Sequence, residues 1–198
     1  MIFTGFTFLL LSRLDIFMLD HYRSSSEVGI YNFVARISAQ VLFVQQLLAV
    51  LFLPRLAKLM SEKKYALVTF ENRRYLIISF ISTLLISLFI YLVFRFGFFK
   101  TYFDIDFNIQ IFLILVFGHC SYSLLSSSSY LLLYLHKEVY EYLNCTLIIV
   151  IGVLMNVWLI PIYGSIGAAI ATTSAIVLGN IFEYLEVRYF MGKINENS

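Results

Sequence analysis

Three ionisable side chains stand inside apolar stretches of the sequence, where charges are costly. Arg13 and Asp15 belong to the first apolar run, and Arg36 belongs to the second. If these runs cross a bilayer in opposite directions, all three lie roughly 7–10 Å below the same surface, at about 1.5 Å rise per helical residue. Charges at that depth must pair or face a watery cavity. We therefore expect Asp15 to pair with Arg36 or Arg13, either to leave a cationic cavity or only to orient two helices.

A surplus guanidinium in such a cavity favours an anionic ligand, because guanidinium binds phosphate or pyrophosphate in a bidentate way. Gln40 suits sugar hydroxyls and equally suits hydrogen bonds between helices. His119, near the middle of its apolar run, could relay protons or pack as a hydrogen-bonded residue. Glu183 falls near the end of the last run, where we expect it to reach the membrane interface.

The composition predicts the elements that position these side chains. Of the 198 residues, 61% are hydrophobic and 13% are charged, whereas a soluble domain carries about 25% charged residues. This excludes a soluble globular protein, and a net charge of +2 gives no basis for nucleic-acid binding. Only helices satisfy the backbone of such long apolar runs in lipid. The fold class is therefore all-α, with residues 1–198 forming a single domain of six transmembrane helices, expected at 2–19, 30–53, 75–94, 109–135, 143–160 and 166–189.

Lysine and arginine are distributed unequally between the two sides of these spans. The cytoplasmic side is the one with more of them, and this places both chain termini in the cytoplasm of a multi-pass membrane protein. That side carries nine: Arg55, Lys58, Lys63, Lys64, Arg73, Arg74, Lys137, Arg188 and Lys193. The other side carries three: Arg23, Arg95 and Lys100.

Two local patterns predict how the helices begin, end and pack. Pro54 is expected to end the second helix, and residues 55–70 alternate apolar and basic residues as a short helix on an anionic lipid surface would. Small residues recur every four positions along the last helix, a spacing that lets two helix backbones approach closely. They are Gly167, Ala171, Ala175 and Gly179.

No loop of the sequence collects a catalytic set. A glycine-rich phosphate loop, a nucleophile elbow and metal-ligand spacing are all missing from it. We therefore expect no enzymatic activity, no metal site and no cofactor other than a proton or a sodium ion.

Five segments together resemble bacterial O-antigen and polysaccharide flippases, which belong to the multidrug/oligosaccharidyl-lipid/polysaccharide exporter superfamily. The first three match the seventh and eighth helices of that family, the fourth matches the next junction, and the fifth matches the turn between the last two helices. They are residues 12–19, 27–31, 35–37, 53–58 and 159–172.

The resemblance implies translocation of an undecaprenyl-pyrophosphate-linked oligosaccharide across the bacterial inner membrane, for O-antigen, capsule or other polysaccharide synthesis. It also implies a transporter of two six-helix lobes, of which this chain resembles the C-terminal one. A truncated or split product is expected, with membrane lipid and a second lobe as partners, supplied by an N-terminal half or another copy. Arg13, Asp15 and Arg36 are the lumen candidates. The alternatives are an exporter of drugs or organic cations, and a membrane-embedded enzyme of glycan assembly.

Overall fold

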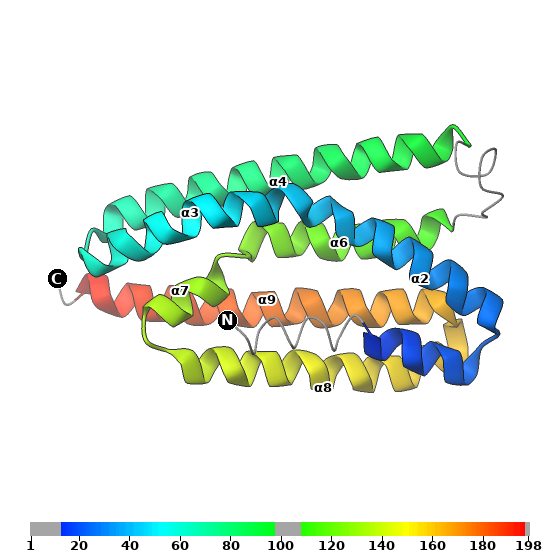
Figure 1. The fold of residues 1–198 in the computed structure, drawn as a ribbon. Coiled ribbons are helices and arrows are strands. Elements are labelled where there is room, and N and C mark those ends of the chain that lie inside the picture. The colour runs from blue at the N-terminus through cyan, green and yellow to red at the C-terminus, as the bar shows by residue number, and fades with distance from the viewer. Residues whose placement is uncertain (1–12, 98–107, 197–198) are drawn as a thin grey trace.

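The computed structural model describes residues 13–97 and 108–196, and every regular element in these ranges is helical. Residues 13–22 form the first described helix. The long helices run side by side in one elongated bundle, with α9 in its middle (Figure 1). The others, in chain order, are α2 (Ser25–Ala39), the 3-10 turn η1 (Gln40–Leu42), α3 (Phe43–Ser61), α4 (Tyr65–Arg95), α6 (Ile109–Leu125), α7 (Ser128–Tyr134), α8 (Glu138–Tyr163) and α9 (Ser165–Glu196).

Five helical segments in the described part of the chain are long and apolar enough to cross a membrane. The all-α class is confirmed, and these helices are consistent with a multi-pass membrane protein. The span expected at residues 2–19 lies mostly outside the described residues, so the sixth crossing stays a prediction. The five segments are Ser25–Ser61, Tyr65–Arg95, Ile109–Tyr134, Glu138–Tyr163 and Ser165–Lys193.

The surface helix expected over residues 55–70 is wrong. Pro54 lies inside α3, which continues to Ser61, and the chain turns at Lys63 (φ 57°) before α4 begins. Leu56 and Met60 of this stretch are buried inside the bundle, whereas Leu67 and Phe70 are exposed. An ion pair of 2.8 Å between Arg55 and the buried Glu71 joins the two helices at this end. A proline is tolerated inside a membrane helix when its neighbours support the opened backbone.

The helix expected over residues 109–135 is interrupted at its serine run. α6 ends at Leu125, and α7 begins again at Ser128. Ser126 and Ser127, between the two helices, are buried. Serine hydroxyls compete with the backbone for hydrogen bonds, which lowers the cost of leaving the helix there. The break offsets α7 from the axis of α6 (Figure 1).

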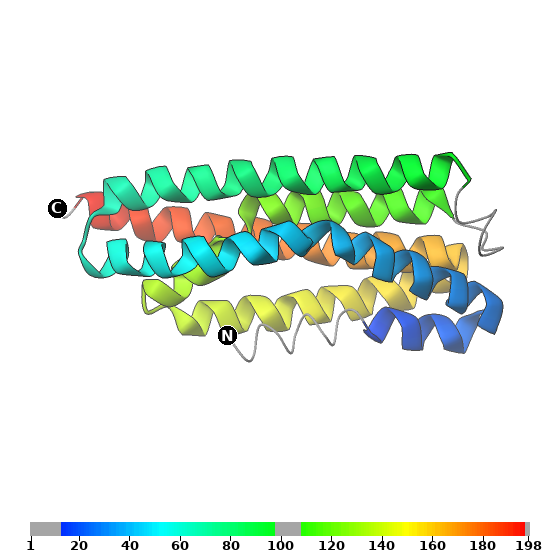
Figure 2. The same cartoon turned by 45° about the horizontal axis from the view of Figure 1, so that its top comes forward.

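The small residues of α9 lie where neighbouring helices come closest. A Cβ atom on Gly167 would collide with the backbone of Leu159 in α8, and one on Gly179 would collide with the Ile148 side chain. Ala171 and Ala175 have no exposed surface. Helices α8 and α9 pack along most of their length (Figure 2).

Two charged side chains near the start of α2 hold the turn between α8 and α9. The Arg23 guanidinium donates to the carbonyl oxygens of Ile160 (3.3 Å) and Pro161 (3.0 Å), at the C-terminal end of α8. A Glu27 carboxylate oxygen accepts from the backbone N–H of Ser165 (2.8 Å), at the first residue of α9. Each charge opposes the partial charge of the helix end that it contacts, so both contacts are favourable.

Replacing Glu27 with alanine removes the acceptor for the Ser165 N–H. We expect Glu27→Ala to lower the free energy of unfolding by about 1 kcal/mol, the usual cost of losing a helix N-terminal cap. The exposed Asp20, at the end of the first described helix, is the control, and Asp20→Ala is expected to change stability by less than about 0.5 kcal/mol. Unfolding in mixed detergent micelles measures both. Equal losses in the two variants would contradict a role for the Glu27 contact.

Candidate functional site

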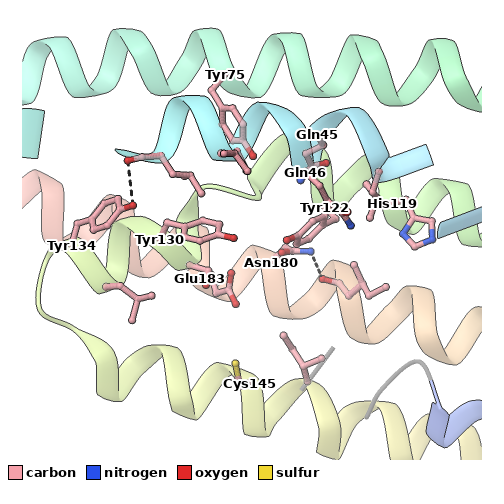
Figure 3. A pocket seen from close by; sticks show the side chains of 18 of the residues that line it. Gln45, Gln46, Tyr75, His119, Tyr122, Tyr130, Tyr134, Cys145, Asn180 and Glu183 are labelled. Carbon is pink, nitrogen blue, oxygen red and sulfur yellow. Dashed lines mark hydrogen bonds between the residues drawn. The ribbon is translucent and has the colours of Figure 1, made fainter. Parts of the chain in front are cut away.

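A cavity of about 640 Å³ lies inside the bundle, between α3 and α4 on one side and α7, α8 and α9 on the other (Figure 3). Its volume is within the range of small-molecule binding pockets, about 300–1,000 Å³. Polar side chains from three helices line it among aliphatic ones. They are Gln45 and Gln46 of α3, His119 of α6, and Asn180 and Glu183 of α9.

Four tyrosines form much of the remaining polar wall. Tyr75 comes from α4, Tyr122 from α6, and Tyr130 and Tyr134 from α7. The Tyr134 hydroxyl donates to the Leu53 carbonyl oxygen at 3.2 Å and so fixes α7 against α3. The break between α6 and α7 brings Tyr130 and Tyr134 to this wall. The cavity thus combines large aromatic surfaces with scattered hydrogen-bonding groups.

Two buried polar atoms at the cavity have no protein partner among the described residues. They are the Gln45 side-chain oxygen and the His119 Nδ1 atom. The Asn180 amide nitrogen donates to the Ile176 carbonyl oxygen at 2.7 Å. Buried polar groups in proteins nearly always bind something. These unpartnered polar atoms can therefore form hydrogen bonds to a polar ligand.

Glu183 is the only acidic residue among the described residues that line the cavity, and no described lysine or arginine lines it. The residue is 5% exposed, so the expectation that it reaches the membrane interface is wrong. α9 continues well past it to Glu196, which leaves Glu183 inside the bundle rather than at a helix end. Two other carboxyls act on it electrostatically: Glu141, which accepts from Ser129, and Glu186, which accepts from Asn144 at 2.7 Å.

Asp15 does not pair with either arginine. Its carboxylate accepts from the Tyr31 hydroxyl at 2.5 Å and from the Thr172 hydroxyl at 3.1 Å, and the residue is 3% exposed. The expected ion pair is therefore wrong. Tyr31 and Arg36 are five residues apart, which places them about 140° apart around α2. Because α2 turns Tyr31 towards Asp15, it turns Arg36 away.

Arg36, in the last turn of α2, and Gln40, the first residue of η1, are exposed instead. The Arg36 Nε atom donates to the Asn32 side-chain oxygen at 3.0 Å, and the Gln40 amide donates to the Arg36 carbonyl oxygen at 3.4 Å. We call Asn32, Arg36 and Gln40 the α2 polar stripe. Arg13, on the helix before α2, is also exposed. Five binding candidates came from the sequence, and His119 alone lines the cavity; Arg13, Asp15, Arg36 and Gln40 are not among its lining residues.

The residues that sequence reasoning missed are the tyrosines of the cavity wall. Tyrosine is frequent in this chain, with 14 copies, so no spacing distinguishes the four at the cavity from the rest.

The chain matches no family model, no curated protein and no solved structure.

Proposed function

We propose that the chain is one lobe of a transporter that moves an undecaprenyl-pyrophosphate-linked oligosaccharide across the bacterial inner membrane. The α2 polar stripe is the observation that carries the proposal. With the span expected to begin at residue 30, Arg36 lies roughly 10 Å along the axis of a membrane-spanning segment. An exposed guanidinium at that depth calls for a water-filled cleft or a protein partner beside it.

Contact with lipid would be energetically unfavourable for the α2 polar stripe. Insertion of an arginine at the centre of a membrane helix costs about 2.5–3.5 kcal/mol on the lowest scales. Three polar residues at four-residue spacing occupy one side of α2, and Asn32 already orients the guanidinium. A cleft along this side would present Arg36, with Arg13 on the neighbouring helix, to an anionic headgroup. The amides of Asn32 and Gln40 suit the hydroxyls of the attached sugars.

A second lobe would supply the opposite wall of the cleft, as the resemblance to the two-lobe flippases implies. Either an N-terminal half or another copy of this chain fits that requirement. The basic end of the α3–α4 hairpin, where Lys58 and Lys64 are exposed, suits anionic lipid on the cytoplasmic side. A proton or a sodium ion remains the proposed coupling ion.

Removing the Arg36 charge tests the pyrophosphate contact. The protein in lipid nanodiscs is titrated with undecaprenyl pyrophosphate and with undecaprenol, which has the same chain and a neutral head. We expect the wild type to prefer the pyrophosphate and Arg36→Gln to lose about tenfold or more of that preference, because a charge-assisted hydrogen bond contributes about 1.5–3 kcal/mol. Arg36→Lys is expected to retain part of it.

Arg188→Gln is the matched control, since Arg188 is exposed near the far end of α9. It is expected to keep the pyrophosphate preference. The same variants, expressed with an N-terminal lobe in a flippase-deficient strain, are scored for surface glycan. We expect glycan with wild type and Arg188→Gln and little with Arg36→Gln. An undiminished preference and normal glycan in Arg36→Gln would contradict the proposal.

A further inference from the structure

The cavity inside the bundle is separate from the α2 polar stripe. None of Asn32, Arg36 and Gln40 is among the residues that line it. The two regions also differ in charge, because the stripe carries a cation and the cavity wall carries Glu183. A pyrophosphate headgroup therefore has no suitable partner inside the cavity, and a different ligand has to be considered for it.

The charges around Glu183 are unbalanced. No described side chain donates a hydrogen bond to its carboxylate, and no described basic group lies within ion-pair distance of it. Glu141 and Glu186 act on it electrostatically with the same sign. A buried carboxylate ordinarily has a cation or strong donors beside it. The arrangement is therefore complementary to a ligand that brings one positive charge.

The aromatic walls of the cavity suit the same charge. The hydroxyl ends of Tyr122 and Tyr130 turn towards the space beside Glu183 (Figure 3). Tyrosine ring faces attract ammonium groups, and desolvated contacts of this kind contribute up to about 2 kcal/mol. The unpartnered Gln45 oxygen adds an acceptor that a protonated amine can donate to.

The rest of the lining is aliphatic and suits an apolar body. This part of the lining includes Val50 of α3, Ile148 of α8 and Ile176 of α9. We propose that this cavity binds a monovalent organic cation, a protonated amine or quaternary ammonium compound with an apolar body, whose charged group contacts Glu183 and the tyrosines. This site goes beyond the proposed transport of an anionic lipid and does not rest on it.

A pair of isosteric probes tests the site. The protein in lipid nanodiscs is titrated with benzyltrimethylammonium and with neopentylbenzene, which has nearly the same shape and no charge. We expect the wild type to bind the cation about tenfold or more tightly than the neutral probe. Glu183→Gln keeps the size of the side chain and removes its charge. It is expected to lose about tenfold in cation affinity and to leave binding of the neutral probe unchanged.

Asp20→Asn is the matched control, because Asp20 is an exposed carboxylate that does not line the cavity. It is expected to change cation affinity less than about threefold. Tyr130→Leu, which removes one ring face, provides a second variant if Glu183→Gln does not fold, and its cation affinity is expected to fall about threefold or more.

Equal affinity of the wild type for the two probes would overturn the proposal. Unchanged cation binding in a folded Glu183→Gln or in Tyr130→Leu would overturn it as well. Arg36→Gln separates this site from the transport proposal, since it is expected to lose the pyrophosphate preference and to bind benzyltrimethylammonium as the wild type does.

Discussion

Gly167→Ala is expected to lower the free energy of unfolding by about 3 kcal/mol, the upper end of the usual cost of overpacking. The added Cβ atom would collide with the backbone oxygen and carbon of Leu159. Backbone atoms cannot rotate away as a side chain can, so α8 and α9 would have to separate next to their connecting turn. Equilibrium unfolding in mixed micelles, followed by circular dichroism, measures the loss.

Two other glycines give graded controls for this substitution. At Gly179 the added atom meets the flexible Ile148 side chain, so Gly179→Ala is expected to cost less than Gly167→Ala. Gly29 has nothing within 4 Å of the new atom. Gly29→Ala is therefore expected to stabilise α2 by about 0.5–1 kcal/mol. If Gly167→Ala proved as harmless as Gly29→Ala, the close α8–α9 contact would be wrong.

Asp15→Ala is expected to destabilise the protein by about 3 kcal/mol. The substitution leaves the buried Tyr31 and Thr172 hydroxyls without their acceptor, and each unsatisfied buried group costs about 1–3 kcal/mol. The substitution also removes the hydrogen bonds that link three helices, because Asp15 lies on the first described helix, Tyr31 on α2 and Thr172 on α9. Equilibrium unfolding in mixed micelles, followed by circular dichroism, also measures this loss of stability.

A double-mutant cycle distinguishes this contact from the ion pair that the sequence suggested. Asp15→Ala combined with Tyr31→Phe is expected to be non-additive by about 1 kcal/mol or more, because the two side chains touch. Asp15→Ala combined with Arg36→Gln is expected to be additive within about 0.5 kcal/mol. A large coupling to Arg36 together with none to Tyr31 would contradict the observed hydrogen bond.

Hydropathy predicted where the described helices lie along the sequence, but it did not predict where they begin and end. The span expected at 143–160 lies within α8, which begins at Glu138 and ends at Tyr163. Apolar residues mark the part of a helix that lies in hydrocarbon, whereas backbone hydrogen bonding continues into the polar flanks. The expectation for Pro54 failed for a related reason. A proline ends helices in water more readily than in a bundle, where packed neighbours such as α4 support the continuing chain.

By itself, the sequence determined that this chain is an all-helical, multi-pass membrane protein, because long apolar runs admit no other backbone arrangement in lipid. It also singled out Asp15 and Arg36 as unusual, but it could not decide which side chain each one faces. Only the tertiary structure decided that, because a helix turns by about 100° per residue and its rotation depends on the packing of its neighbours. For the same reason the cavity around Glu183, built from helices far apart in the sequence, became visible only in three dimensions.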